Sequence, residues 1–249
     1  MPTKEPREIM LRVPASCRPA ARDRATQEQM ETIEEYTEGI YRLQEELDVV
    51  STGDIAKYMS VAPASVTTML KKLVEFGFVE HTPYHGVQLT PKGNQLSISL
   101  LRKHRLVECM LVDFLELPWE DVHELACKLE HYLSEEVTDR IARAMGYPVT
   151  CPHGNPIDAT LKDGSRRLSD GEVGREFTVI KITDERLEFL SYVRDIGLLP
   201  HTAIRIHSRT PFGDVMNLIV EGREPAIAVG REVTDSVWVC ERPPCVETD

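Results

Sequence analysis

Hydrophobic residues recur at helical spacing over the first part of the sequence and at strand spacing over its last part. From residue 31 to residue 146, most apolar positions follow one another three or four residues apart, as they do on one face of a helix. From about residue 171, short apolar runs alternate with turn residues, as they do in a sheet. The pattern predicts a mainly α-helical chain with a small β-domain, a barrel or a sandwich, after the helices.

Residues 51–93 have the rhythm of a winged helix-turn-helix. A short helix and a tight turn come before a second helix, which Pro63 can begin and Gly77 can end. Two extended runs, 78–81 and 87–90, then surround a turn. Helix, turn, helix and hairpin in this order predict a domain that places its second helix in the major groove of DNA.

The helical pattern continues on both sides of this domain. A helix is predicted over 31–46, and three more over 93–117, 119–133 and 134–146, the last with Ser134 as its N-cap. The domains predicted from these patterns are a mobile N-terminal tail (1–28), a winged-helix domain (29–92), a helical domain (93–160), a linker (161–170), the β-domain (171–241) and a C-terminal tail (242–249).

The helix at 119–133 carries two separate stripes. Its leucines lie on one face, and a second face carries His123, Cys127, Glu130 and His131. Thiolate, imidazole and carboxylate together are typical ligands of a first-row transition metal. The alternative is a pair of surface histidines beside a buried cysteine.

Two further helices offer ligands. His104 and Glu108 are one turn apart in a helix too apolar to lie on the surface, and with His123 they make a second possible set. Glu35 and Glu38 lie three residues apart on the first predicted helix. The alternatives are a buried His–Glu hydrogen bond for the first pair and a solvated acidic face for the second.

The thiols are expected to be reduced or bound to metal. No apolar run approaches the roughly 18 residues of a membrane helix, and the first residues lack the apolar core of a secretory signal. We therefore expect a cytoplasmic protein without a membrane partner.

Cys151 in the Cys-Pro-His-Gly loop is a further thiol candidate, whereas its neighbour His153 is interpreted as an ordinary polar loop residue. The six cysteines lie far apart, at Cys17, Cys109, Cys127, Cys151, Cys240 and Cys245.

Taken over the whole chain, the net charge of −12 argues against nucleic acid as a partner. The charge is, however, distributed unevenly along the sequence. Residues 51–110 carry seven Lys or Arg against four acids, whereas 31–50 carry one against seven. The basic block coincides with the predicted winged helix. Small, hydroxyl and basic residues there suit thymine methyl groups and phosphates. The residues expected to contact DNA are Thr52, Ala62, Ala64, Ser65, Thr67, Thr68, Lys71 and Lys72.

Several of these segments together resemble one family. They are EEYTEGIYRL, SVAPASVTTMLKKL, LTPKG, RKHRLVECML, VHELACKLEHYLSEEV and CPHGNPI. The chain resembles the diphtheria-toxin-repressor family of metal-dependent transcriptional repressors. The resemblance implies a homodimer with an N-terminal winged helix, a helical dimerisation and metal domain, and a C-terminal SH3-like or FeoA-like β-barrel.

The resemblance also implies two metal ions per subunit. One site would comprise Glu35, Cys127, Glu130 and His131, joined in some branches by Cys151, with Glu38 as a second acid in manganese sensors. The other would comprise His104, Glu108 and His123, completed in some members by a carboxylate of the third domain, here Asp184, Glu185 or Glu188.

The choice of metal depends on Glu35. Iron sensors of the family carry Met at this position and manganese sensors carry an acid, so the resemblance favours Mn²⁺ here. Fe²⁺ is the alternative, because the thiol of Cys127 suits a softer ion. The predicted function is a repressor of metal-homeostasis genes that the ion orders for binding to operator DNA.

An enzyme is not expected, because the motifs HExxH, GxSxG, the P-loop and GxGxxG are absent, and no small organic substrate is expected either. The alternatives are a metal-dependent hydrolase and a metal-binding adaptor that uses its winged helix on protein.

Overall fold

The computed structural model describes residues 21–82, 86–211 and 214–241. The chain divides into two compact units, residues 1–93 and 94–249. Among the described helices, none is both long enough and apolar enough to cross a membrane. The first 20 residues, the predicted C-terminal tail, Cys17 and Cys245 lie outside the described residues.

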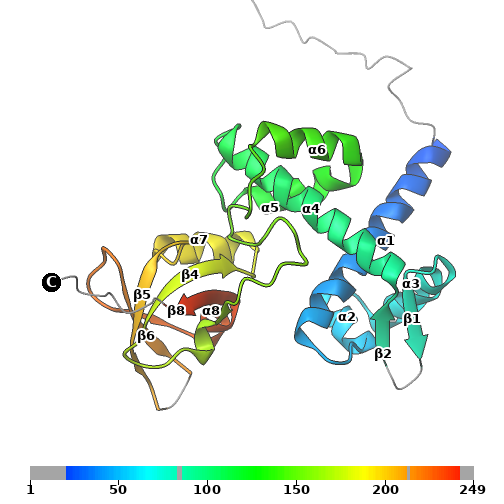
Figure 1. The fold of residues 1–249 in the computed structure, drawn as a ribbon. Helices are drawn as coiled ribbons and strands as arrows, with labels where there is room; N and C mark the ends of the chain where they lie inside the picture. Colours follow the sequence, from blue (N-terminus) through cyan, green and yellow to red (C-terminus); the bar gives the residue numbers. More distant parts are fainter. Residues whose placement is uncertain (1–20, 83–85, 212–213, 242–249) are drawn as a thin grey trace, which may run out of the picture. The chain divides into compact units, whose positions relative to one another are not determined.

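The first unit has the predicted order of a winged helix-turn-helix (Figure 1). Its hairpin strands pair antiparallel, and the backbone of Val50 pairs with Val87 beside them. Its elements are α1 (Ala21–Glu46), α2 (Thr52–Tyr58), α3 (Pro63–Glu75), β1 (Val79–Thr82) and β2 (Gly86–Leu89).

Local sequence explains how these helices begin. The Ser51 hydroxyl accepts from the backbone of Asp54, whose carboxylate accepts from the backbone of Ser51, and this reciprocal cap starts α2. Pro63 stands at the first turn of α3, as predicted. The start of α1 at Ala21 was predicted too late, at residue 31, because the preceding residues lack apolar spacing but are good helix formers.

The second unit begins with helices. They are α4 (Pro91–Asp113, whose first residues belong to the first unit), α5 (Val122–Leu129), a 3₁₀ turn η2 (Glu130–Tyr132) and α6 (Glu135–Ala144). Ser134 caps α6 as predicted, by accepting from the backbone N–H of Val137. The single helix predicted over 119–133 is wrong at both ends, since α5 starts later and its last turn tightens into η2.

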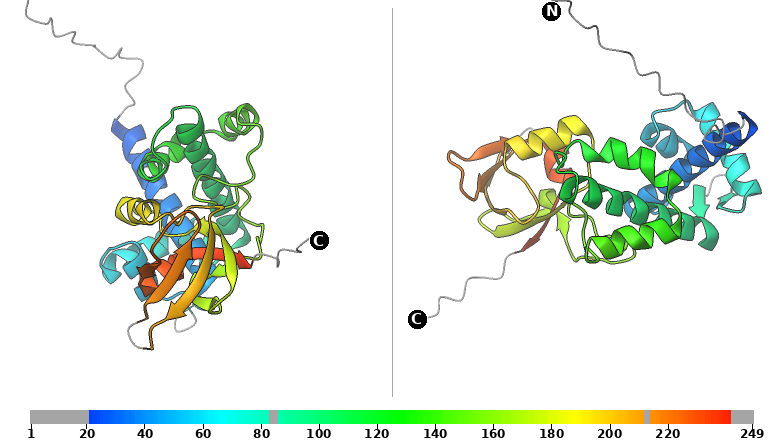
Figure 2. Two further views of the ribbon diagram at one scale, coloured as in Figure 1. Left: turned by 90° about the vertical axis from the view of Figure 1, so that its left-hand side faces the viewer. Right: turned by 90° about the horizontal axis from the view of Figure 1, so that it is seen from above.

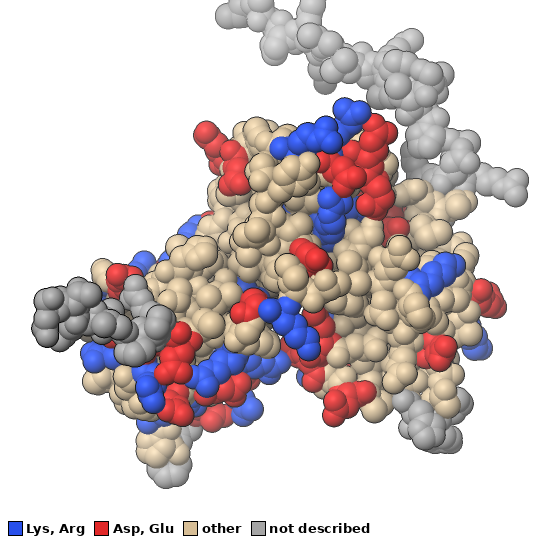
Figure 3. Space-filling view, viewed as in Figure 1, with Lys and Arg blue, Asp and Glu red and all other residues tan. Residues whose placement is uncertain are grey.

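Ion pairs join α4 to α6 on the surface. Arg102 and Asp139 lie 2.7 Å apart, and Lys103 and Glu135 lie 3.0 Å apart. Acidic and basic side chains lie together on the part of the surface around α6 (Figure 3). Exposed pairs of this kind contribute little stability.

The β-domain is one curved antiparallel sheet with the strand order β3-β8-β4-β5-β6-β7 (Figure 2). Its interior is apolar, with Phe177, Ile182, Leu190 and Leu198 fully buried. Its elements are β3 (Arg166–Arg167), η3 (Leu168–Asp170), β4 (Glu176–Ile182), α7 (Leu187–Asp195), β5 (Ala203–Arg209), β6 (Met216–Val220), β7 (Ile227–Val229), α8 (Arg231–Ser236) and β8 (Val237–Glu241).

The β-domain starts earlier than predicted. Residues 166–170 were assigned to a linker, but β3 pairs with β8 and Leu168 is fully buried in the core of the domain. The segment is polar and short, so its single buried leucine left too weak a pattern to detect.

The loop after α6 lies against β4. The His153 carbonyl accepts from the backbone of Ile182, and the Asn155 side chain donates to the Ile182 carbonyl at 3.1 Å. Gly154 has φ of +86°, and a Cβ there would overlap the carbonyl oxygen of Ile180. Both the backbone conformation and the close approach therefore require glycine.

We predict that Gly154→Ala destabilises the second unit by about 2–5 kcal/mol, the sum of left-handed backbone strain and overpacking. Gly164→Ala is the matched control, because Gly164 has φ of +69° with nothing within 4 Å of the added Cβ. Its cost should be only about 1–2 kcal/mol. Chemical denaturation measures both. Equal effects of the two substitutions would contradict the docking of this loop on β4.

Candidate metal centre

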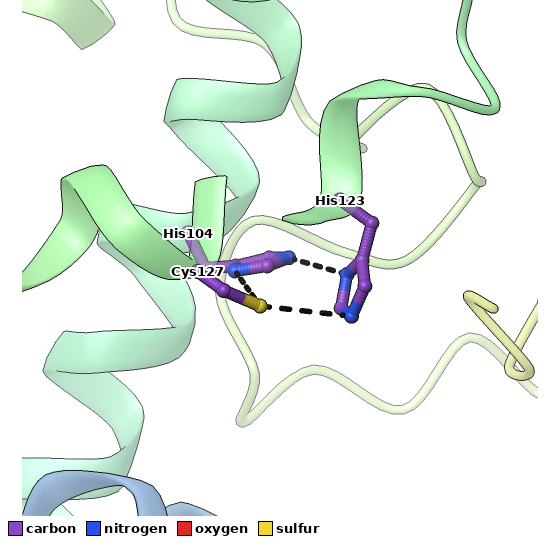
Figure 4. Close-up of side chains that lie close together, drawn as sticks. All are labelled: His104, His123 and Cys127. Atoms are coloured by element: carbon purple, nitrogen blue, oxygen red, sulfur yellow. Dashed lines mark hydrogen bonds between the residues drawn. The ribbon is translucent and has the colours of Figure 1, made fainter. Parts of the chain in front are cut away.

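Two helices of the second unit bring a histidine pair and a thiol together. His104 lies on α4, and His123 and Cys127 lie one turn apart on α5. Figure 4 shows the three side chains pointing toward one another. The nearest nitrogens of the two rings are 3.1 Å apart, and Cys127 Sγ is 3.6 Å from His123 Nε2 and 4.0 Å from His104 Nδ1.

His104 lies between two buried carboxylates. Its Nδ1 is 2.6 Å from Glu130 Oε2, and its Nε2 is 3.0 Å from Glu108 Oε1. The other oxygen of Glu130 is 3.6 Å from His131 Nε2. Hydrogen bonds on both ring nitrogens fix the orientation of the His104 ring without an exposed partner.

The β-domain adds one carboxylate to this cluster. Glu185 lies between β4 and α7, and its Oε2 is 3.3 Å from His123 Nδ1. Asp184 instead pairs with Arg186, and Glu188 is exposed. Of the three acids considered for this position, the structure therefore brings Glu185 to the cluster.

Cys151 and His153 approach Glu108 from the loop that lies on β4. His153 has no exposed surface, and its Nδ1 is 3.1 Å from Glu108 Oε1. One ligand atom each of Glu108, Cys151 and His153 lie within 4.8 Å of one another. The interpretation of His153 as an ordinary polar loop residue is wrong, because the left-handed Gly154 lets the loop turn the ring inward, and the spacing of residues in the sequence does not show this.

The charges of the cluster compensate one another. Burial alone would lower the pKa of His104 and His153, but Glu108 chiefly raises both well above the usual value. Burial would likewise lower the pKa of His123. The contacts that this ring makes with Cys127 and the carboxylates instead raise it to about 10. Burial would raise the pKa of Cys127, yet the two histidines beside it lower it. These pKa shifts favour charged imidazoles beside charged carboxylates, but one oxygen of Glu108 is still left without a partner among the described residues.

The donor set fits a divalent cation. Among the described residues, Glu108 Oε2 and His153 Nδ1 are buried without a hydrogen-bond partner of normal geometry. A buried carboxylate oxygen without a partner is costly, and coordination to a cation removes that cost. Imidazole, thiolate and carboxylate together suit Mn²⁺, Fe²⁺, Co²⁺ or Zn²⁺.

The acids predicted on the first helix belong to the first unit. Glu35 is exposed on α1, and Glu38 accepts from Arg42 Nε at 2.9 Å. Their contribution to a metal site stays a prediction. That Cys151 shares a metal site with Cys127 also stays a prediction, because the structure groups Cys151 with Glu108 and His153.

The residues predicted to contact DNA lie on α2, on α3 and, for Ala62, at the N-cap of α3. Val66, Leu70 and Leu73 of α3 are buried, so the opposite face of this helix is turned outward. Thr52 begins α2 and is half-buried, as is Lys72. The exposed members of the set are Ala62, Ala64, Ser65, Thr67, Thr68 and Lys71.

Family models match nearly all of the described chain. The N-terminal DNA-binding domain of iron-dependent repressors matches residues 28–87, and the metal-binding and dimerisation domain of these repressors matches residues 90–159. The FeoA domain matches residues 166–240, which agrees with the start of the β-domain at β3.

Whole proteins match as well. The iron-dependent repressor IdeR of Mycobacterium leprae is 30% identical over 78% of this chain and 91% of its own. The diphtheria toxin repressor of Corynebacterium glutamicum is 34% identical over 58% of this chain and 64% of its own. A solved structure of a manganese-dependent transcriptional repressor in complex with manganese is 29% identical, with a TM-score of 0.78 over 84% of this chain and 100% of that chain. The chain therefore belongs to the iron-dependent repressor family, whose members, the diphtheria toxin repressor among them, are metal-dependent DNA-binding transcriptional repressors.

Proposed function

We propose that this protein is a homodimeric, cytoplasmic repressor of metal-homeostasis genes that binds operator DNA when Mn²⁺ is bound, with Fe²⁺ as the alternative corepressor. The observation that carries the proposal is the buried cluster around Glu108, in a chain that also has a winged helix. The family relationship supports regulation and not catalysis as the role of the bound ion.

Two sets of residues would hold the ions. Cys127, Glu130 and His131 would form one set with Glu35, and His104, Glu108, His123 and Glu185 the other. When bound, a divalent cation supplies positive charge and fixed ligand directions. Because Glu35 lies in the first unit and Cys127 in the second, their sharing of an ion would couple the DNA-binding unit to the metal centre.

The outward face of α3 suits the major groove. Thr67 Oγ1 donates to the Pro63 carbonyl at 3.0 Å, and Thr68 Oγ1 donates to the Ala64 carbonyl at 3.1 Å. Since both hydroxyl donors are occupied within the helix, the methyl groups of these threonines remain for contact with thymine. Lys71 is exposed on the same helix and suits a backbone phosphate.

A homodimer is supported by apolar side chains that the helical domain leaves exposed. Leu125 and Leu129 on α5 are 40% and 41% exposed, and Phe114 and Leu115 after α4 are each 59% exposed. These side chains lie within the segment that matches the dimerisation domain of the family. Two copies that bury this surface would present two α3 helices, which suits an operator with two half-sites about 34 Å apart.

We predict that duplex DNA binding depends on metal. A site selected from a randomised duplex pool should bind with Mn²⁺ and lose most of its affinity when a chelator removes the ion. Fluorescence anisotropy with Mn²⁺, Fe²⁺, Co²⁺ and Zn²⁺ in parallel measures this response. Lys71→Ala should weaken binding to all duplexes and reduce the salt dependence, because one phosphate contact is lost. Affinity that is unchanged by chelation would contradict the proposed function.

A second prediction tests the choice of metal through Glu35. Glu35→Ala should weaken Mn²⁺ activation of DNA binding by roughly 10–100-fold or more, since loss of even an outer-shell partner costs that much. Glu35→Met should reduce activation by Mn²⁺ more than activation by Fe²⁺ or Co²⁺, because a thioether is a poor ligand for Mn²⁺.

Glu34→Ala is the matched control for these variants, because it removes the neighbouring carboxylate, which points about 100° away around α1. It should leave the metal response unchanged. If Glu35→Ala had the same Mn²⁺ midpoint as Glu34→Ala, Glu35 would not be a ligand and the preference for manganese would lose its basis.

A further inference from the structure

One turn of the second unit contacts both the cluster around Glu108 and the β-domain. It lies between α4 and α5, where the N–H of Asp121 donates to the Pro118 carbonyl at 3.0 Å. Trp119 is one of the two central residues of this turn, and its carbonyl accepts from Nε2 of His153 at 2.8 Å. We propose that Trp119 is a positioning residue of the metal centre, which fixes the contact between His153 and Glu108 and makes that contact depend on the β-domain. The inference rests on the proposed metal dependence and not on DNA binding.

The Trp119 carbonyl decides which nitrogen of His153 is left for Glu108. A carbonyl can only accept, so Nε2 carries a hydrogen and Nδ1 is the nitrogen that faces the carboxylate. Nδ1 is 3.1 Å from Oε1 of Glu108, but a neutral ring with its hydrogen on Nε2 cannot donate to that oxygen. The contact then needs a metal ion or a second proton between the two atoms.

The alternative tautomer shows what the carbonyl prevents. A histidine without an acceptor at Nε2 can carry its hydrogen on Nδ1. His153 in that form would donate to Glu108, and the pair would be complete without an ion. By holding the hydrogen on Nε2, Trp119 keeps Nδ1 available for a cation.

The indole of Trp119 determines where this carbonyl lies. Its ring centroid is 5.0 Å from that of His153, with the two planes inclined by 50°. The indole also packs against the apolar core of the β-domain. Its Nε1 is buried and has no hydrogen-bond acceptor among the described residues, so packing alone holds the ring.

A second anchor joins the same turn to the β-domain. Glu120, the other central residue of the turn, is buried and forms an ion pair with Arg194 of α7. The partner of the Trp119 carbonyl is anchored there too, because the His153 carbonyl accepts from the N–H of Ile182 in β4 at 2.9 Å. Both ends of the hydrogen bond between Trp119 and His153 are therefore held by the packing of the β-domain.

The second tryptophan of the chain provides a matched control. Trp238 on β8 also belongs to the β-domain, and its Nε1 is likewise buried without an acceptor in the described part of the chain. Its ring contacts Lys181 and Arg167, at 4.8 Å and 5.9 Å from the ring centroid, and not a histidine. Trp238→Ala thus removes an indole from the same domain without touching the contact of His153.

The experiment measures Co²⁺ binding to the full-length protein without DNA. Titration against a competing chelator gives the affinity of each bound ion, and the visible absorption spectrum reports the ligand geometry. Trp119→Ala should weaken the affinity for at least one Co²⁺ by about 10–100-fold, as loss of an outer-shell partner does, and should change the spectrum. Trp119→Phe should retain most of the affinity and the wild-type spectrum, because Nε1 makes no hydrogen bond. Trp238→Ala should bind Co²⁺ as the wild type does.

Glu120→Gln tests the second anchor without a change of volume. It should weaken Co²⁺ binding in the same direction as Trp119→Ala but by a smaller factor. Chemical denaturation of the metal-free variants establishes which of them are folded. The same Co²⁺ affinity and spectrum in Trp119→Ala and Trp238→Ala would overturn the proposal. If Trp119→Ala does not fold, wild-type Co²⁺ affinity in Glu120→Gln would overturn it instead.

The proposed function fails in a different way. A protein whose Co²⁺ affinity depends on Trp119, but which binds no duplex, would refute the proposed function and leave this inference standing. Metal-dependent duplex binding together with wild-type Co²⁺ affinity in folded Trp119→Ala would refute this inference alone.

Discussion

The arrangement of the second unit depends on the burial of the Glu108 carboxylate. This side chain has no exposed surface, and one of its oxygens has no hydrogen-bond partner among the described residues. Removing a carboxylate from water costs several kcal/mol unless nearby positive charge compensates for it. His104 and His153 can supply that charge when they are protonated, and they hold the pKa of Glu108 well below its usual range. A cation can bind to these rings only after they lose those protons. The cation and the protons therefore compete for the same ring nitrogens.

This requirement explains why distant segments of the sequence converge. The helices α4 and α5 provide one face of the cluster, the loop on β4 provides Cys151 and His153, and the β-domain provides Glu185. An ion pair between Arg194 of α7 and the buried Glu120 joins the same two domains. Because Glu185 and the loop on β4 belong to the cluster, an ion bound there would contact both the helices and the β-domain.

The sequence revealed those parts of the fold that depend on local patterns. The winged helix and the His104–Glu108 pair follow from apolar spacing and from neighbours one helical turn apart. His153 was missed because its burial depends on the left-handed Gly154 and on the contact of that loop with β4, neither of which leaves a periodic pattern. Glu185 could be narrowed only to one of three nearby acids, since the choice among them depends on tertiary packing. The family resemblance supplied the roles of the ligands, which the spacing of residues could not.

The central claim is that the cluster around Glu108 is a cation site that lacks full compensation without its ion. The free energy of unfolding of the full chain, measured by chemical denaturation with and without Mn²⁺, tests this claim most directly. A cation that binds only the folded state stabilises it by about 2.7 kcal/mol when its free concentration is 100 times the dissociation constant. We predict a stabilisation that grows with the logarithm of free Mn²⁺ and is reversed by a chelator. An unfolding free energy that does not change with Mn²⁺, Fe²⁺, Co²⁺ or Zn²⁺ would contradict the account.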